Sequence, residues 1–264
     1  VEIPRGSGIS LISQTLEDNG VVKNAKVFKY YVKFKNESGF QAGTYNLSPS
    51  MTIQEIIDQI KNGIVAETYR ITIPEGRDLE QISEIIAKKT GKKSKDVLAV
   101  INKNGFIKEM MKKYPDLLTD DILAENIRYP LEGYLYPATY SFYEEDPTIE
   151  SIVSEMVKKT NEILAKYKDE MSKDKWTPHT LLTMASLIEE EATEKVDRDK
   201  ISAVFKNRME KDMRLQTDPT VLYALGEHKD RVTYKDLEVN SPYNLYRHKG
   251  LTPGPIANAG ETSI

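Results

Sequence analysis

The sequence predicts an α+β protein of two domains, in which a few short strands accompany a larger number of helices. One observation behind this prediction is a strand–helix–helix pattern that begins near Ile3 and again near Ile73. The other is the set of long amphipathic helical patterns in the second half of the chain. A chain of 264 residues, of which 39% are hydrophobic, is long enough to bury one or two cores.

The repeat is defined by matching residues in its two copies. Both copies begin with Ile-Pro-x-Gly, at 3–6 and at 73–76, and continue with apolar residues at helical spacing. A looser third copy, from Thr44 to Gly63, has a strand, a turn and a helix. Units this small cannot bury a core alone, so we expect their strands to pair with one another. The matched pairs are Ile9 with Leu79, Ile12 with Ile82, Ser13 with Ser83, Leu16 with Ile86, Val27 with Val97, and Phe28 with Leu98.

Two further stretches are predicted as scaffold, and an aromatic segment lies between them. Residues 92–126 are lysine-rich and read as amphipathic helices, and residues 147–167 read as one longer helix. The segment 129–142 contains prolines, a glycine and one acid, Glu132, and so cannot be a regular helix. Its rings either pack a linker between domains or form a platform that stacks on sugar faces. They belong to Tyr129, Tyr134, Tyr136, Tyr140 and Phe142.

The next helix ends in three consecutive carboxylates. Thr177 and Pro178 are typical of a helix start. The apolar residues that follow lie on one stripe, which predicts a core helix. They are Leu181, Met184, Ala185, Ile188 and Ala192.

The carboxylates Glu189, Glu190 and Glu191 differ in their helical phase. Glu190 points away from the apolar stripe, whereas the other two border it. The residues one turn before Glu191 are Leu187 and Ile188, which are more apolar than Ala185 and Ser186, one turn before Glu189. This difference slightly favours a raised pKa for the Glu191 carboxyl group. The alternative is a solvated acidic turn that pairs with the downstream cations Lys195 and Arg198.

The last quarter of the chain alternates between helix and shaped loop. A helix is predicted over residues 197–212, with its inward positions at Ile201, Val204, Phe205 and Met209. Three polar side chains then occur in a row where regular structure breaks, a common setting for a site. These are Gln216, Thr217 and Asp218.

Composition excludes several classes of function. A net charge of −4 gives no overall field for binding nucleic acid or an anionic membrane. The chain has no cysteine, and its three histidines do not lie at metal-ligand spacing, so we expect no metal site. No stretch reads as a signal peptide or a membrane span. The chain starts at Val1 rather than Met and ends soon after a Gly/Pro-rich stretch, so we expect a piece of a longer protein, truncated at its C-terminus.

Five motifs, taken in order, resemble those of a known family. LEGYLYPATY (131–140) is followed by SLIEEEA (186–192), MRLQTDPT (213–220), SPYNLY (241–246) and GLTPGPIANAG (250–260). Together they resemble the YceG-like (MltG) family of endolytic murein transglycosylases, over essentially the whole chain. The repeated Ile-Pro-x-Gly pattern also resembles the LysM module, which binds N-acetylglucosamine-containing polymers. The resemblance implies a LysM-like repeat region over 1–127 and a mainly helical, lysozyme-like catalytic domain over 128–264.

The layout is also similar to that of lysozyme-like transglycosylases, in which Glu-Ser, Met-Gln and Tyr-Asn elements build the site. Glu191, followed by Ala192, stands at the position of the Glu, which favours it over Glu189 as the catalytic residue. Ala192 lacks the expected hydroxyl group, and Ala138 replaces an Asp that is more usual in the family's aromatic stretch. These two departures put in doubt a hydrogen bond near the acid and an essential role for position 138.

The resemblance implies a lytic transglycosylase, which cleaves the β-1,4 bond between N-acetylmuramic acid and N-acetylglucosamine within glycan strands. Glu191 would act as acid and then as base, leaving a 1,6-anhydro end, and no cofactor would be needed. Alternatives are a hydrolytic muramidase, which uses a second carboxylate, and a non-catalytic peptidoglycan-binding protein. The residues expected to bind substrate are Gln216, Tyr243 and Asn244, followed by Thr217, Asp218 and Glu132.

The resemblance also implies a place in the cell. The full protein would be held by an N-terminal membrane helix that this chain lacks, with its catalytic part on the extracytoplasmic side. Peptidoglycan strands would be its substrate and cell-wall synthesis proteins its neighbours, whereas no nucleic acid is expected.

Overall fold

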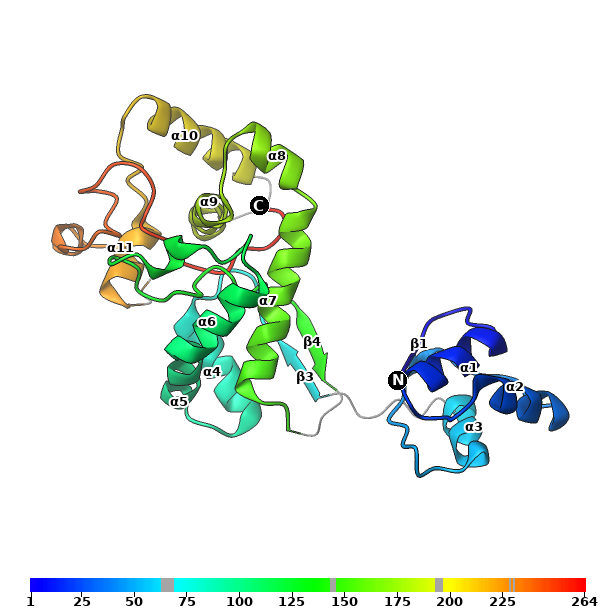
Figure 1. Cartoon of the computed structure of the whole chain (residues 1–264). Helices are drawn as coiled ribbons and strands as arrows, with labels where there is room; N and C mark the ends of the chain where they lie inside the picture. The colour runs from blue at the N-terminus through cyan, green and yellow to red at the C-terminus, as the bar shows by residue number, and fades with distance from the viewer. Residues whose placement is uncertain (63–68, 143–145, 193–196, 228, 230) are drawn as a thin grey trace. The chain divides into compact units, whose positions relative to one another are not determined.

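The structure, a computed structural model, describes residues 1–62, 69–142, 146–192, 197–227, 229 and 231–264. Its described part is α+β, as predicted: helices predominate, and four short strands form two two-stranded sheets (Figure 1). The chain divides into two compact units. Unit 1 comprises residues 1–69 and 141–145, and unit 2 comprises residues 70–140 and 146–264.

Unit 1 is a small sheet with three helices. β1 pairs antiparallel with β2, placing Glu2 opposite Thr44. Tyr45, which is almost completely buried, follows β2 and donates its hydroxyl hydrogen bond to the Gln41 carbonyl at 2.6 Å. The core is aliphatic and aromatic, and includes Ile3, Leu16, Phe28, Ile57 and Ile60. The elements are β1 (Glu2–Ile3), α1 (Ile9–Asp18), α2 (Ala25–Phe34), β2 (Gly43–Thr44) and α3 (Ile53–Asn62).

Unit 2 begins with the second copy of the repeat and continues into a helical body. α4 starts at a capping box formed by Asp78 and Gln81, and it ends at Gly91 in the left-handed conformation. The elements up to the long helix α7 are β3 (Tyr69–Thr72), α4 (Leu79–Thr90), α5 (Ser94–Ile101), α6 (Asn104–Lys113), the 3-10 helix η1 (Asp120–Leu123), β4 (Thr139–Phe142) and α7 (Ile149–Ala165); residue 69 of β3 and residues 141–142 of β4 are counted in unit 1.

The rest of unit 2 is built around α9, which packs against α10 and α11. Residues of these helices and of the loops after them share a second apolar cluster, which includes Leu187, Phe205, Leu215 and Leu245. The elements are α8 (Lys168–Lys173), α9 (Pro178–Glu191), α10 (Arg198–Glu210), α11 (Asp218–Leu225) and the 3-10 helix η3 (Asp236–Glu238).

The predicted repeat is present in the structure. Both full copies fold as strand, helix, helix, and the third copy folds as β2 followed by α3; its last residue, Gly63, lies outside the described residues. Ser13 and Ser83 are buried at the same position and donate to the carbonyl four residues earlier. The second helices differ in register, because Val27 is exposed whereas its counterpart Val97 is buried. The LysM-like identity of the repeat stays a prediction.

Strand pairing follows the prediction only in part. The first copy pairs its strand with that of the third copy, β1 with β2, as expected. The strand of the second copy, β3, instead pairs with β4 from the aromatic segment. This pairing places the second copy in unit 2, and the compact units divide near residue 70. The repeat region over 1–127 and the catalytic domain over 128–264 stay a prediction.

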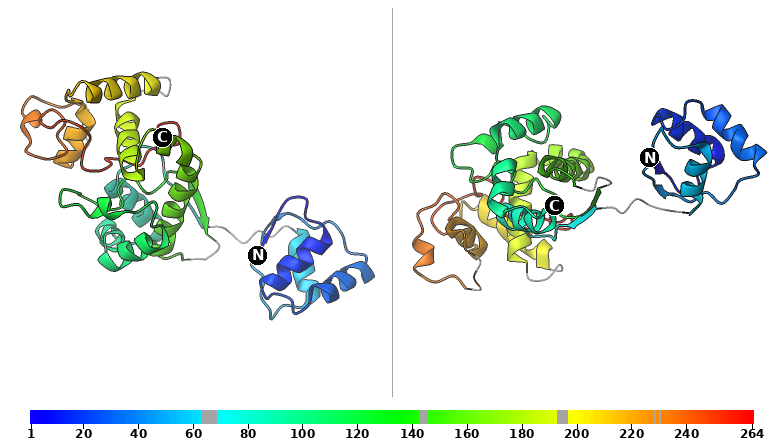
Figure 2. Two further views of the ribbon diagram at one scale, coloured as in Figure 1. Left: turned by 45° about the horizontal axis from the view of Figure 1, so that its top comes forward. Right: turned by 90° about the horizontal axis from the view of Figure 1, so that it is seen from below.

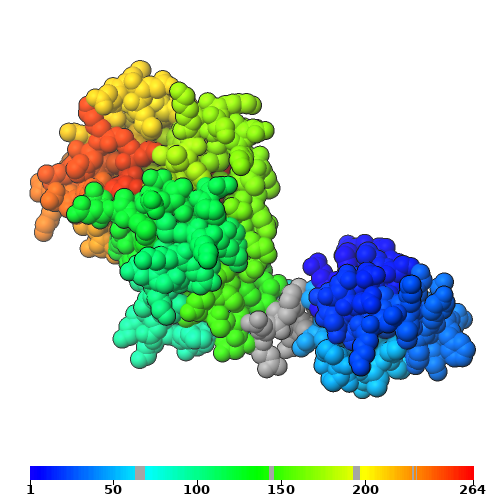
Figure 3. Space-filling view, in the orientation of Figure 1, coloured from blue at the N-terminus to red at the C-terminus, as the bar shows by residue number. Residues whose placement is uncertain are grey.

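The C-terminal segment passes through the interior of unit 2. Asn258 is completely buried, and its side chain bonds to two separate parts of the chain. Its Nδ2 donates to the Arg77 carbonyl at 2.9 Å and to Glu132 Oε1 at 3.0 Å, while its Oδ1 accepts from the Leu135 backbone at 2.8 Å. In the space-filling view, orange-red atoms of the C-terminal part are visible at the surface between yellow and green parts of unit 2 (Figure 3).

Candidate functional site

α9 carries the three candidate carboxylates at its C-terminal end. The helix starts as predicted: Thr177 and Thr180 form a reciprocal capping box, and Pro178 occupies the first position. The predicted stripe is too narrow, because Leu182, Thr183, Ser186 and Leu187 are buried along with Met184, Ala185 and Ile188. A helix enclosed on most sides has no single solvent direction. The contacts of each carboxylate, rather than its helical phase, therefore determine its environment.

Glu189 is part of a buried ion pair. Its Oε1 accepts from Arg198 Nη2 at 2.6 Å, and both side chains are less than one tenth exposed. Its Oε2 accepts from Ser263 Oγ at 2.7 Å and from the Gly260 backbone at 3.2 Å. These bonds join α9, α10 and the C-terminal segment. Glu189, the second choice for the catalytic acid, thus has a structural environment, with both oxygens occupied.

Glu190 faces a polar groove, although phase analysis placed it away from the packed side. The groove has a volume of about 390 Å³ and includes Gly76, Arg77, Asp78 and Pro219 among its lining residues. Glu190 as a whole is exposed, but desolvation of its carboxyl group raises its pKa to about 7, helped by the Glu189 and Asp78 charges and opposed by Arg77. Gly76 is required here, because its φ is +74° and a Cβ would lie 2.9 Å from Glu190 Oε1.

Glu191 is exposed and is held by one hydroxyl group. Thr217 Oγ1 donates to Glu191 Oε2 at 2.5 Å, and Thr217 is only 1% exposed. The apolar setting expected from Leu187 and Ile188 one turn earlier is therefore wrong: α9 ends at Glu191, so its side chain projects beyond the packed turns. One carboxylate oxygen is fixed by the buried threonine, while the residue remains open to solvent.

The loop that precedes α11 brings three predicted residues to this carboxylate. Gln216 is exposed and adopts the left-handed conformation with φ of 53°, which is uncommon for a residue with a side chain. Its backbone N–H donates to the Leu245 carbonyl at 3.2 Å, which anchors the turn. Thr217 and Asp218 follow as the N-cap and the first residue of α11. The structure therefore places Gln216, Thr217 and Asp218 in one loop, in which Thr217 contacts Glu191.

Tyr246 belongs to the same cluster, although it was not among the residues expected to bind substrate. Its hydroxyl donates to Asp218 Oδ1 at 2.5 Å. Partial burial, this hydrogen bond and the negative charges of Asp218 and Glu191 raise the pKa of Tyr246 to about 12. A polar aromatic two residues after a motif asparagine was the available signal in the sequence. It was too weak to separate Tyr246 from the neighbouring Tyr243.

Tyr243 and Asn244 were expected to bind sugar, but both side chains are buried and form hydrogen bonds within the protein. The Tyr243 hydroxyl accepts from the Arg128 backbone at 3.2 Å, and its ring packs 5.0 Å from that of Tyr223. Asn244 is completely buried and donates to two backbone carbonyls, each at 2.9 Å. Its Oδ1 accepts from the Tyr246 backbone at 3.0 Å. These residues shape the loop that presents Tyr246.

Glu132 lies in the interior, which contradicts a role in direct contact with substrate. It is 2% exposed and accepts hydrogen bonds from the Leu79 backbone, the Tyr223 hydroxyl and Asn258 Nδ2, at 3.0, 3.2 and 3.0 Å. Burial, with the nearby Asp78 charge, raises the pKa of Glu132 to about 8 against the lowering effect of its donors. Glu132 thus joins α4, α11 and the C-terminal segment.

The raised pKa of Glu132 predicts a pH-dependent stability. Between the unfolded value near 4.5 and about 8, the folded chain keeps this proton while the unfolded chain loses it. Stability therefore falls as pH rises through this window, by on the order of 1 kcal/mol per pH unit. We expect Glu132→Gln to remove this share of the slope, measured by urea unfolding from pH 5 to 8.5. An unchanged slope would mean that the folded chain carries Glu132 ionised throughout.

Comparison with known proteins identifies the family. The sequence profile of the YceG-like family matches residues 1–264. The chain belongs to the YceG-like family. The resemblance predicted from five ordered motifs is thereby confirmed.

Relatives of this YceG-like chain include named enzymes. A Bacillus subtilis (strain 168) protein named endolytic murein transglycosylase is 53% identical over 263 residues, covering 100% of this chain and 73% of the relative. A protein of the same name from Streptococcus pneumoniae serotype 2 is 37% identical over 272 residues, covering 97% of this chain and 49% of the relative. A solved yceG-like protein from Listeria monocytogenes matches with a TM-score of 0.73 and 52% identity, over 100% of this chain and 87% of that one.

The aromatic segment of this YceG-like chain packs inward rather than forming a platform. Tyr134, Tyr140 and Phe142 are all less than one tenth exposed. The Tyr134 hydroxyl lies 2.9 Å from His179 Nδ1, and the Tyr140 hydroxyl donates to the Tyr136 carbonyl at 2.5 Å. Of the two interpretations of this segment, the packed one is therefore correct for these three rings.

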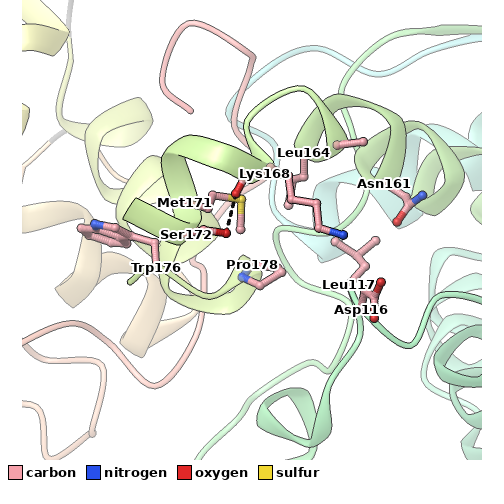
Figure 4. A pocket seen from close by; sticks show the side chains of 10 residues that line it. Asp116, Leu117, Asn161, Leu164, Lys168, Met171, Ser172, Trp176 and Pro178 are labelled. Carbon is pink, nitrogen blue, oxygen red and sulfur yellow. Dashed lines mark hydrogen bonds between the residues drawn. The ribbon is translucent and has the colours of Figure 1, made fainter. Parts of the chain in front are cut away.

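A second cavity of about 350 Å³ lies at the opposite end of α9 (Figure 4). Pro178, at the first position of the helix, lines it together with Trp176, the only tryptophan of the chain. Because a helix of 14 residues spans about 20 Å, this cavity is remote from Glu191.

Among the described residues no group of three His, Asp or Glu side chains could hold a metal ion, and no helix is long and apolar enough to cross a membrane.

Proposed function

We propose that this chain is an endolytic lytic transglycosylase that cleaves the bond between N-acetylmuramic acid and N-acetylglucosamine in peptidoglycan. The activity is supported by the names of its relatives at 53% and 37% identity. One observation supports the choice of Glu191. It is exposed, and it is the carboxylate of the three that accepts a hydrogen bond from the Gln216–Asp218 loop, from Thr217 Oγ1 to its Oε2 at 2.5 Å. Glu189 is bound to Arg198 and Ser263, and Glu190 faces a separate groove.

Glu191 would act first as acid and then as base. Its proton passes to the glycosidic oxygen as the bond from that oxygen to C1 breaks, leaving an oxocarbenium-like sugar. The 6-hydroxyl of the same muramic acid then attacks C1 and returns its proton to the Glu191 carboxylate. The products are a 1,6-anhydro end and a free 4-hydroxyl, so no water is consumed. Thr217 Oγ1 donates only to Oε2, which leaves Oε1 to transfer the proton.

The neighbouring side chains would position the sugar. Gln216 is held in its strained conformation by the backbone bond to Leu245, with its exposed amide available for the N-acetyl group. Asp218 and Tyr246 form a hydrogen-bonded pair on the same side of the site. The groove beside Glu190 would hold a flanking part of the glycan, so that the second repeat contributes its Gly76–Asp78 turn to substrate binding.

The reaction would take place outside the cell membrane, because murein lies there. The full protein would then be anchored with its catalytic part facing the wall, near cell-wall synthesis proteins.

Product analysis tests the proposal against its two alternatives. Purified peptidoglycan is digested with the chain, and its new ends are identified by mass spectrometry. We expect 1,6-anhydro-muramic ends within the strands. Reducing ends would instead indicate a muramidase, for which Asp218 is a second carboxylate in the same site. Binding to peptidoglycan without new ends would indicate a non-catalytic glycan-binding protein.

A further inference from the structure

α2 in unit 1 exposes an apolar stripe. Val27, Tyr30 and Phe34 are 57%, 72% and 86% exposed. At about 100° per residue these three positions fall within about 60° of one another on the helix. Scattered exposed apolar residues are normal on a protein surface, but three large ones on one short helix form a patch. Helix α1 lies beside α2 (Figures 1 and 2). Its Leu11 is also 52% exposed.

Lysines border this stripe. Positions 23, 26, 29, 33 and 35 are all lysine, and no acidic residue occurs between Asp18 and Glu37. By helical phase Lys26 and Lys33 lie on one side of the stripe, and Lys35 lies on the other. Among the described residues, Lys26 and Lys33 have no ion pair or side-chain hydrogen bond.

The acidic residues that flank α2 in the sequence have other partners. Glu37 Oε2 accepts from Lys61 Nζ at 2.6 Å, and Asp18 Oδ1 accepts from Gln14 at 2.9 Å. Glu37 also interacts electrostatically with Lys35, so the positive charge of α2 that has no acidic partner among the described residues includes that of Lys26 and Lys33. It contrasts with the net charge of −4 of the whole chain, which gave no sign of an anionic partner.

We propose that α2 binds the surface of an anionic phospholipid bilayer. An amphipathic helix of this kind lies in the interface, with Val27, Tyr30 and Phe34 among the upper acyl carbons and the lysines at the phosphates. The lysine side chains extend along the apolar stripe while keeping their ammonium groups at the headgroup level. A soluble polyanion would use the lysines but would leave the apolar stripe in water. The stripe therefore favours a lipid surface, and the proposal does not depend on the chemistry of Glu191.

Vesicle binding tests the proposal. The chain is co-sedimented with vesicles of phosphatidylcholine alone and with vesicles containing 30% phosphatidylglycerol. We expect binding only to the second, weakening as salt rises. Val27→Ser/Tyr30→Ser/Phe34→Ser should abolish it, and Lys26→Gln/Lys33→Gln should weaken it about fivefold for each lysine. In a Trp176→Phe background, Tyr30→Trp should show a blue-shifted emission on binding.

Matched controls lie in unit 2. Tyr234 is 91% exposed and Lys93 and Lys95 are exposed, so Tyr234→Ser and Lys93→Gln/Lys95→Gln should leave binding unchanged. Circular dichroism checks that each variant is folded. Equal sedimentation of wild type and the triple serine variant would overturn the proposal. It would also be overturned if the chain bound polyphosphate but not the vesicles, or if the triple variant lost binding to purified peptidoglycan instead.

Discussion

Replacing Glu191 by Gln is expected to reduce glycan cleavage by about 10² to 10⁴-fold, the usual contribution of a general acid and base. Gln keeps the size of the side chain, and its carbonyl oxygen can still accept the 2.5 Å hydrogen bond from Thr217, but it cannot transfer a proton. Binding to peptidoglycan should survive. Release of soluble glycan fragments measures cleavage, and co-sedimentation with purified peptidoglycan measures binding.

The neighbouring residue provides the matched control for this variant. Glu190→Gln changes the same chemical group one position away, at a carboxyl whose pKa is raised to about 7. We expect it to keep most of the cleavage rate and to alter chiefly the pH dependence of substrate binding in the groove. If Glu190→Gln were the inactive variant and Glu191→Gln the active one, the catalytic carboxyl would be the one facing the groove.

Replacing Glu189 by Ala is expected to lower the free energy of unfolding by about 3–5 kcal/mol, because it leaves Arg198 buried without its partner. The same change removes the acceptor of Ser263 Oγ and of the Gly260 N–H. Arg198→Ala should cost a similar amount. Urea unfolding followed by circular dichroism measures both.

A surface ion pair gives the comparison. Lys158 and Glu155 lie 3.1 Å apart on α7 with half-exposed side chains, so Lys158→Ala should cost less than about 1 kcal/mol. Joint replacement of Glu189 and Arg198 by apolar residues should restore much of the lost stability, because no charge remains buried. A cost below 1 kcal/mol for Glu189→Ala would show that this carboxylate is not held as a buried ion.

Local patterns predicted the helices well. The Thr177-Pro178 start and the matched repeat residues correspond to observed elements, because capping and amphipathic spacing act within a few residues. Partners distant in the sequence were less predictable. Nothing near β3 in the sequence specifies that it pairs with β4, some 70 residues later.

The sequence predicted which segments form the site, but not which of their side chains point into it. The motif order selected Glu191, Gln216, Thr217 and Asp218, and the structure places these residues at one end of α9. The motif order did not show that Asn244 is buried within its own loop, where its side chain donates hydrogen bonds to the backbone carbonyls of Leu237 and Val239. Nor did a single apolar stripe describe α9, because the C-terminal segment also covers it: the Ile256 backbone donates to Ser186 Oγ at 3.1 Å.

The bonds of Asn258 have a consequence for folding during synthesis. This side chain bonds to Arg77, 181 residues earlier, and to Leu135 and Glu132, 123 and 126 residues earlier. Unit 2 cannot complete its interior until residue 258 has left the ribosome, whereas unit 1 draws almost entirely on the first 69 residues. The two units are therefore expected to fold in sequence, with the larger one remaining incomplete until residue 258 has been synthesised.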